Sequence, residues 1–171
     1  MMRTSAYLAI AALALSCVRP EAVDQEQPMT PAEAREYQIQ MQRERLEIER
    51  AAIQSFIDSS EHSFVDYGNG LWVANLTRAT CDDHKDTNNV TVIHDALMSL
   101  EGDLFVSHKA REFLLLRDQD VAWGIQQALL GRCPQDSLAV IIPAHLAHGV
   151  AGDMANVPPM STVLCYLRIL K

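Results

Sequence analysis

The chain begins with an apolar run at residues 6–15 (AYLAIAALAL), preceded by Arg3. A helix needs about 20 apolar residues to cross the roughly 30 Å hydrocarbon core of a bilayer, so this run is too short to span it. A positive residue followed by a short apolar run is instead typical of a secretory signal peptide. Polar sequence follows at once, and residues 18–29 contain Pro and show no periodicity, which predicts a flexible tether.

Residues 13–17 (LALSC) close the apolar run and are similar to a bacterial lipobox, with a small Ser directly before Cys17. We therefore expect a lipoprotein signal peptide over residues 1–17 and lipidation at Cys17. Several acyl chains, each worth about 0.8 kcal/mol per buried methylene, would then hold the protein on a membrane. The alternative is an ordinary signal peptide in which Cys17 is a chance residue.

A long helix is predicted from residue 30 to about residue 59. Residues 30–33 (TPAE) have the spacing of a capping box, with Pro at the first helical position, and no Gly or Pro interrupts the stretch that follows. A mostly apolar stripe recurs at steps of three and four residues: Leu46, Glu49, Ile53, Phe56 and Ile57. We expect the charged first half to project into solvent and the second half to pack on the domain. A free amphipathic helix on a membrane is the weaker alternative, because the apolar face is narrow and Glu is abundant.

Beyond the Gly-Asn-Gly of residues 68–70 the chain changes to short apolar runs separated by turns. The strands that this pattern predicts are residues 70–77, 89–100, 104–106, 112–116, 137–142 and 161–170. Residues 81–88 form a predicted polar loop, residues 120–131 a short helix that ends at Gly131, and residues 143–159 a longer loop. Several strands with one short helix predict an α+β domain, an antiparallel sheet with a helix on one face.

Composition narrows the possible functions. The chain is 49% hydrophobic and 21% charged, which excludes a wholly disordered or fibrous protein. Its net charge of −8 argues against nucleic-acid binding through a basic surface. The four cysteines have no C-x-x-C spacing, so a zinc ribbon or a redox motif is unsupported. Cys165 lies in an apolar run and reads as a buried free thiol, whereas Cys81 and Cys133 could pair, a question that the sequence leaves open.

An ordered set of short motifs occupies the last fifty residues. The short helix ends in Gly131, a strand leads into Ile142-Pro143, AHLAHG follows at residues 144–149, and after Gly152 comes VPPMST at residues 157–162. This order and spacing resemble the FKBP-type peptidyl-prolyl isomerases. The resemblance covers residues 68–171, behind a helical segment at residues 30–67. It implies an FKBP-like antiparallel half-barrel sheet wrapped on one short helix, here preceded by an N-terminal amphipathic helix.

The chemistry of such a protein needs an apolar pocket rather than a reactive group. Rotation about an X-Pro amide must cross about 18–20 kcal/mol, because resonance gives the bond partial double-bond character. The twisted transition state has lost this resonance and much of its dipole, so a water-poor pocket favours it over the planar ground state. We therefore expect no cofactor and no metal. His145 and His148 have an H-x-x-H spacing, but they lack a clear third ligand.

The resemblance also implies which residues line the pocket: Phe105, Phe113, Val121, Ala122, Ile125, His148 and Val157. Several of the family's pocket residues are replaced in this chain. Val106 stands where the family has a pocket Asp, Ile125 stands where it has the Trp of the pocket floor, and His148 replaces a Tyr whose hydroxyl holds the peptide.

Two further replacements involve aromatic residues of the family. Cys165 replaces an aromatic on the last strand, and a strand Tyr is replaced near His94 or Asp95. The backbone N–H of Val121 is expected to contact the bound peptide.

Two functions follow as expectations. The first is a peptidyl-prolyl cis-trans isomerase that assists the folding of envelope or secreted proteins. It would be tethered through Cys17 on the periplasmic side of a bacterial inner or outer membrane, with proline-containing polypeptides as partners and no nucleic acid. The second is a catalytically weak FKBP-like chaperone or a binding module of a gliding apparatus. A lipobox and a charged helix before the domain are similar to the gliding-motility-associated lipoprotein isomerases of Bacteroidetes-type bacteria.

Overall fold

The structure is a computed structural model that describes residues 29–82 and 90–171. The expected signal peptide, Cys17 and nearly all of the tether lie outside the described residues, as does most of the predicted loop at residues 81–88. The chain divides into two compact units, residues 1–38 and residues 39–171. The first 8 residues of the long helix belong to the first unit and the rest to the second.

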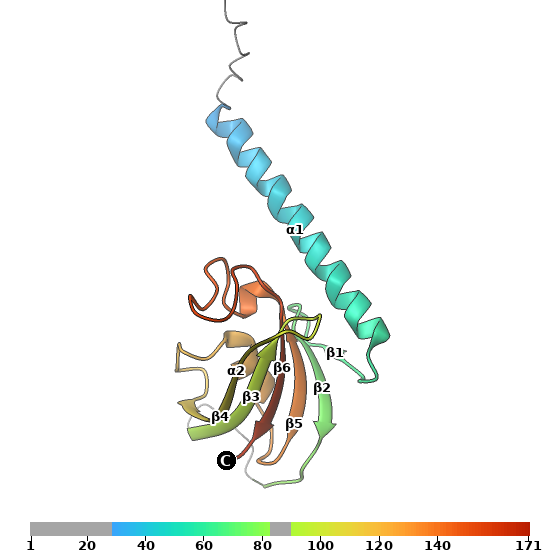
Figure 1. Ribbon diagram of the computed structural model, residues 1–171, viewed down its shortest axis with the longest axis vertical. Coiled ribbons are helices and arrows are strands. Elements are labelled where there is room, and N and C mark those ends of the chain that lie inside the picture. Colours follow the sequence, from blue (N-terminus) through green and yellow to red (C-terminus); the bar gives the residue numbers. More distant parts are fainter. Residues whose placement is uncertain (1–28, 83–89) are drawn as a thin grey trace, which may run out of the picture. The chain divides into compact units, whose positions relative to one another are not determined.

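Six strands form one antiparallel sheet in the order β1-β2-β5-β6-β3-β4 (Figure 1). In chain order the elements are α1 (Pro31–Ser59), β1 (Val65–Asp66), β2 (Trp72–Thr77), β3 (Val90–Met98), β4 (Leu104–Leu114), α2 (Trp123–Leu129), β5 (Ser137–Ile142), the 3-10 helix η1 (Ala144–Leu146) and β6 (Val163–Ile169). The predicted fold class is confirmed: an antiparallel sheet with one short helix against it, preceded by a long helix.

The predicted capping box starts α1. The Thr30 hydroxyl accepts a hydrogen bond from the Glu33 N–H at 3.3 Å, and the Glu33 carboxylate accepts one from the Thr30 N–H at 2.8 Å. Two N–H groups that the first helical turn leaves without helical partners are thereby paired. None of the helices in the described part of the chain is both long and apolar enough to cross a membrane.

Within residues 39–171 the sheet carries apolar side chains on both faces, because side chains along a strand alternate between faces. On β5, Val140 and Ile142 join the large cluster around α2, whereas Ile141 between them joins a smaller cluster with Ile53 of α1. The second half of α1 therefore packs on the domain, as predicted. Glu49 adds a polar contact, accepting hydrogen bonds from the Ala144 N–H and the Thr162 hydroxyl, both at 2.7 Å.

One long strand, β4, replaces the two strands predicted at residues 104–106 and 112–116. The pairing of β3 with β4 shifts register twice, between Leu97 and Met98 and between Ile93 and Asp95 of β3. Each shift inserts an extra residue into β4 and interrupts the alternation of apolar and polar positions. The polar stretch SHKAR, which falls between the two predicted strands, therefore belongs to β4.

A disulfide joins Cys81 to Cys133, with the two Cα atoms 5.7 Å apart, which answers the question left open by the sequence. Asp136 supports this corner: its carboxylate accepts hydrogen bonds from the Ala79 N–H at 2.6 Å and from the Cys133 N–H at 2.9 Å. Cys165 is a buried free thiol, as predicted, and burial raises its pKa. It is therefore a core residue that stays protonated.

Gly124 sets how closely α2 approaches the sheet, and its replacement by Ala is expected to destabilise the fold. A Cβ at this position would collide with Cγ2 of Ile142 and lie 3.2 Å from Leu71. Gly-to-Ala changes inside helices usually stabilise by about 1 kcal/mol, but overpacking a core costs about 1–3 kcal/mol, so we expect Gly124→Ala to lower the free energy of unfolding. Urea denaturation measures the change.

A double-mutant cycle identifies the cause of this loss. In an Ile142→Ala background the collision is absent, so Gly124→Ala is expected to cost clearly less than in the wild-type background. Equal costs in the two backgrounds would contradict this explanation.

Candidate functional site

A cavity of about 410 Å³ opens beside the start of α2. Three parts of the chain line it: the segment that joins β4 to α2, the first turn of α2, and the loop that follows η1. The lining residues are Leu116, Arg117, Asp118, Gln119, Asp120, Val121, Ala122, Trp123, Gln126, Ala147 and His148. The wall is apolar at Val121, Ala122 and Ala147, and the rim is polar.

The structure brings the residues predicted for the pocket into one region, at different depths. Val121, Ala122 and His148 line the cavity itself. Four others do not line it. Phe113, Ile125 and Val157 are buried in the apolar cluster around α2, which also contains Val121 and Ala122, and Phe105 packs half-buried against that cluster. Ile125 is fully buried, so it forms core beneath the cavity.

Gln126 holds the β4–α2 segment in place from within the core. Its side chain accepts a hydrogen bond from the Leu116 N–H at 2.6 Å and donates to the carbonyls of Asp118 and Val121, both at 2.7 Å. Only 2% of this residue is exposed. One buried amide therefore ties three backbone groups of the cavity wall to α2.

On the opposite side, Asp153 shapes the loop that carries Val157. Its carboxylate accepts hydrogen bonds from three successive backbone N–H groups, those of Ala155, Asn156 and Val157, at 2.7–2.9 Å. Burial acts to raise the pKa of Asp153, but these donors and the nearby His148 together lower it. The turn at Gly152 is also tight, because a Cβ there would collide with the carbonyl oxygen of Val157.

His148 faces the cavity from this loop. Burial lowers its pKa below the ordinary value of 6.5, the charge of Asp153 raises it, and the charge of Arg111 lowers it further, with a net downward shift. The ring is therefore neutral at pH 7 and keeps one N–H donor and one acceptor nitrogen. Its Nε2 atom is buried and has no hydrogen-bond partner among the described residues.

Two of the predicted replacements can now be located. Val106 packs half-buried against the apolar cluster, so it brings no carboxylate to the wall. On β3 the neighbouring His94 is exposed while Asp95 is fully buried, so Asp95 is the residue on the inner face. Trp123 lines the cavity and is 46% exposed.

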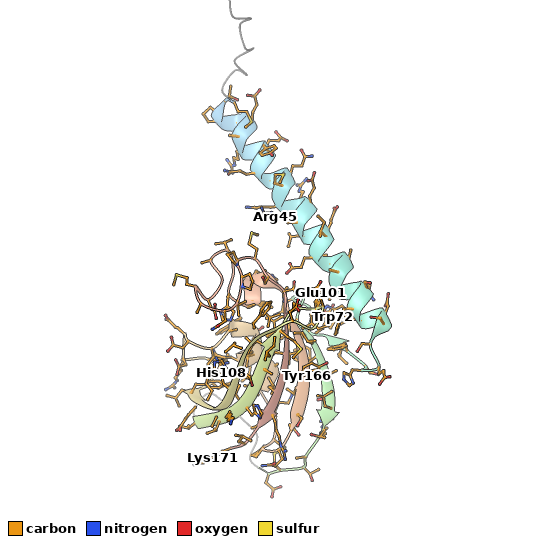
Figure 2. The ribbon with its side chains drawn as sticks, in the orientation of Figure 1. Arg45, Trp72, Glu101, His108, Tyr166 and Lys171 are labelled. Atoms are coloured by element: carbon orange, nitrogen blue, oxygen red, sulfur yellow. A yellow bond between two sulfur atoms is a disulfide. The ribbon has the colours of Figure 1, made fainter. Side chains whose placement is uncertain are left out.

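Asp95 is the core of a small ionic cluster. Arg111 donates to its Oδ2 atom at 2.9 Å, and Nδ1 of His108 lies 3.2 Å from the same oxygen. Both partners come from β4, and Figure 2 shows His108 on that strand. Asp95 and its partner Arg111 therefore bring a charged group to the inner face of a wall that is otherwise apolar.

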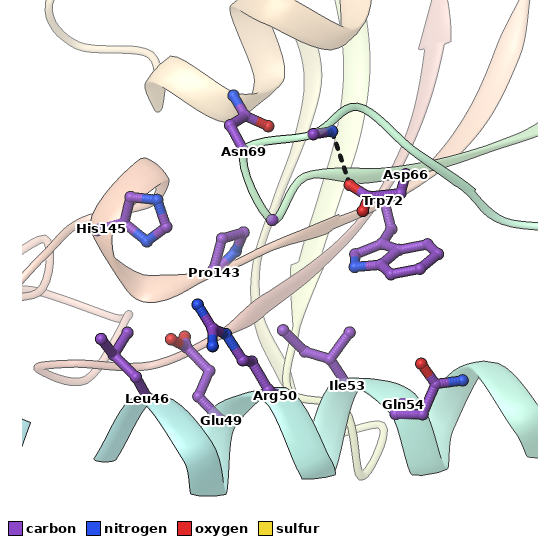
Figure 3. Close-up of a pocket in the computed structure, with 12 residues that line it drawn as sticks. Leu46, Glu49, Arg50, Ile53, Gln54, Asp66, Asn69, Trp72, Pro143 and His145 are labelled. Atoms are coloured by element: carbon purple, nitrogen blue, oxygen red, sulfur yellow. Dashed lines mark hydrogen bonds between the residues drawn. The ribbon is translucent and has the colours of Figure 1, made fainter. Parts of the chain in front are cut away.

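A larger groove of about 840 Å³ lies elsewhere, between α1, residues 66–72 and the start of η1 (Figure 3). Glu49 and Arg50 extend from α1 toward Pro143 and His145, and Trp72 lies across the groove. None of the residues predicted for the pocket lines it. It lies on the side of the sheet where Ile53 of α1 packs, and the smaller cavity remains the candidate site.

No group of three or more His, Cys, Asp or Glu residues able to hold a metal ion occurs within residues 29–82 and 90–171. What the cavity offers is an apolar wall, a neutral imidazole and backbone donors. Such an arrangement can bind an apolar peptide segment and hold it by hydrogen bonds.

Solved structures with the same architecture are FKBP-type proteins. A peptidyl-prolyl cis-trans isomerase from Pseudomonas syringae pv. tomato matches with a TM-score of 0.62 and 18% identity, covering 84% of this chain and 97% of its own. FkpA from Escherichia coli matches with a TM-score of 0.61 and 17% identity, covering 84% of this chain and 73% of its own. AtFKBP13 matches with a TM-score of 0.57 and 18% identity, over 64% of this chain and 98% of its own. The chain has the FKBP fold.

Sequence comparison alone finds no match, either to a family model or to a curated protein. The likeness therefore lies in the fold, with fewer than one residue in five identical in these three pairs.

Two features of the site were not predicted from the sequence. Gln126 is one of two adjacent glutamines in an otherwise apolar stretch, and only the direction it faces reveals its role. Asp95 was left open with His94 as the position that replaces a family Tyr, and its alternation with the apolar Ile93 and Leu97 is the signal that could have singled it out.

Replacing Gln126 by Leu is expected to loosen the cavity wall. The change leaves one N–H and two carbonyls without their partner, and each such loss costs about 1–3 kcal/mol when the group stays buried. With partial rehydration we expect a total loss of about 2–4 kcal/mol in urea denaturation and faster amide exchange at Leu116.

Gln127→Leu is the matched control for this variant. Gln127 lies on the same helix, and its side chain makes one exposed hydrogen bond, with Asn69. Its replacement is expected to cost less than about 0.5 kcal/mol. Equal losses in the two variants would contradict the role given to Gln126.

His148 is expected to titrate below pH 6.5 in the folded chain. Because its folded-state pKa is lower than that of the unfolded chain, the unfolded state binds more protons as the pH falls through this range, so acidification costs stability. The contribution of His148 is fully present above pH 6.5 and is lost as the pH falls below that value. NMR titration of the His148 ring, with the urea-unfolded chain as reference, measures both values, and a folded-state pKa at or above the unfolded one would contradict the assignment.

Proposed function

We propose that this protein is a peptidyl-prolyl cis-trans isomerase whose active site is the cavity beside α2. The observation that carries the proposal is the convergence of Val121, Ala122 and His148 on one cavity of an FKBP fold. Behind this wall lie Phe113, Ile125 and Val157, which keep the inner side of the cavity apolar.

The geometry suits the chemistry of amide rotation. A proline ring and the residue before it would pack against the apolar wall and lose water. The planar amide loses more favourable solvation there than the twisted amide, so the barrier falls from its value of about 18–20 kcal/mol in water.

Hydrogen bonds would hold the peptide while the amide turns. Among the described residues none accepts a hydrogen bond from the Val121 N–H, which leaves this donor for a peptide carbonyl. The neutral imidazole of His148 supplies a second group from the opposite side of the cavity. No proton is transferred, so neither group needs to titrate during the reaction.

Localisation is part of the proposal: a lipid anchor at Cys17 on the periplasmic side of a bacterial membrane, and folding assistance to envelope or secreted proteins. The signal-peptide pattern of residues 1–17 supports export. The disulfide between Cys81 and Cys133 agrees with it, because such bonds persist in oxidising compartments outside the cytosol.

A second candidate function is a weakly catalytic chaperone or binding module, including an accessory of a gliding apparatus. Two observations favour it. Ile125 and Val106 fill the wall with core side chains. Three large apolar residues stay exposed, Trp123 of the cavity at 46% and two residues of the loop after η1, Val150 at 78% and Met154 at 92%, and they could hold unfolded chains.

Catalysis is expected to depend on Phe105. The purified full-length chain should accelerate cis–trans isomerisation of a leucyl-prolyl tetrapeptide in a protease-free assay. Phe105 packs half-buried against the cluster that backs the cavity, and removing its ring should lower kcat/KM by about tenfold, since 1.4 kcal/mol corresponds to a factor of ten.

Phe64→Ala is the matched control, because Phe64 packs against the cluster beneath α1. We expect this variant to keep wild-type kcat/KM. A wild-type rate equal to the blank at tens of micromolar protein sinks the isomerase proposal, and retained peptide binding would then favour the binding module.

A further inference from the structure

Asp95 is a buried carboxylate on the apolar inner face of the sheet. Along β3 the fully buried residues alternate as Thr91, Ile93, Asp95 and Leu97. Ile93 and Leu97 belong to the cluster that also contains Val121, so strand geometry turns Asp95 toward the same cluster. None of its surface is exposed. A buried charge is costly unless it is paired and hydrogen-bonded, so its presence here needs an explanation.

Its pairing is incomplete. Arg111 at 2.9 Å and His108 at 3.2 Å both contact Oδ2, whereas Oδ1 has no partner among the described residues. Nε of Arg111 is likewise buried and without a partner. Gln126 and Asp136, the other buried residues with carboxyl or amide side chains, instead place theirs in hydrogen bonds to backbone groups.

Neither Asp95 nor Arg111 lines the cavity, but Asp95 lies on the sheet face whose residues Ile93 and Leu97 pack in the same cluster as Val121 of the cavity wall. The charge of Arg111 acts on His148, which lines the cavity, and Nε2 of His148 is a third buried atom without a partner. Both partners of Asp95 come from the edge strand β4, and the side chains of Arg111 and His108 remain 20% and 36% exposed. One acceptor and one charged donor are therefore buried behind the apolar wall without partners among the described residues.

We propose that Asp95 and Arg111 form the polar anchor of this pocket, with Asp95 Oδ1 accepting a hydrogen bond from a backbone N–H of the bound peptide and Arg111 Nε donating to a peptide carbonyl. Both atoms are buried, so the proposal requires the Arg111 side chain to move aside when the peptide binds. The ligand class is a proline-containing peptide whose proline is flanked by residues with free N–H groups. This inference rests on the proposed function. It gives the pocket a carboxylate from β3, although Val106 removes the one expected from β4.

The test compares amide with ester ligands. Acetyl-Ala-Leu-Pro-Phe-methylamide and two depsipeptides, in which an oxygen replaces the N–H of either Leu or Phe, are titrated into the full-length chain by calorimetry. Hydrogen bonds to charged groups are among the stronger ones, so we expect one depsipeptide to bind about tenfold more weakly than the amide. Asp95→Asn presents a donor or a neutral acceptor in place of the carboxylate, and this preference is expected to fall below about twofold.

Thr91→Val is the matched control, because Thr91 is equally buried on the same face of β3 and its hydroxyl also lacks a partner. Thr91→Val should keep the wild-type preference. If Asp95 had only a structural role, Thr91→Val and Asp95→Asn would be expected to change the preference alike. Should Asp95→Asn fail to fold, equal binding of the three ligands by the wild-type chain would still overturn the anchor.

The possible failures differ. Equal binding of the amide and both depsipeptides by the wild-type chain overturns the anchor and leaves the proposed function standing. A preference that survives in folded Asp95→Asn also overturns the anchor. No binding of any probe contradicts the proposed function, and the anchor with it.

Discussion

The size of α2 relative to the sheet is the constraint on which the candidate site depends. A helix of 7 residues is about 10 Å long, whereas the 11 residues of β4 extend over about 35 Å. The helix therefore covers only part of the inner face, and Gly124 lets it pack directly on Ile142. The rest of that face is left to the segment before α2 and the loop after η1, and the cavity lies where these two meet.

The cavity combines an apolar wall with a few polar groups whose positions are set by the backbone around them. Gln126 ties the segment before α2 to the helix, and Asp153 folds the loop that bears His148 and Val157. Both use neutral or exposed groups to organise backbone amides. Asp95 differs, because it is a buried charge with an oxygen to spare. That difference is the basis for proposing Asp95 as the polar anchor of the pocket.

Much of the fold could be predicted because local patterns and tertiary structure agree. Ser137–Ile142 was predicted with its observed bounds, since a short apolar run between turns has few alternatives, and the capping box at Thr30 marked the start of α1. β4 was split in two because its bulges break the alternation that sequence reading relies on. The choice between His94 and Asp95 stayed open because a shift of one residue moves a side chain to the other face. The partner of Cys81 and the direction of Gln126 depend on contacts distant in sequence, which local pattern does not encode.

Mapping the binding of a prolyl peptide onto the backbone amides tests the central claim most directly. The peptide is titrated into the ¹⁵N-labelled full-length chain and the amide shifts are followed by NMR. We expect saturable changes at Val121, Ala122 and His148 and none at Gln54, Gly68 or Gly70 in the groove beside α1. Changes confined to that groove, or no changes at millimolar peptide, would contradict the assignment of the pocket.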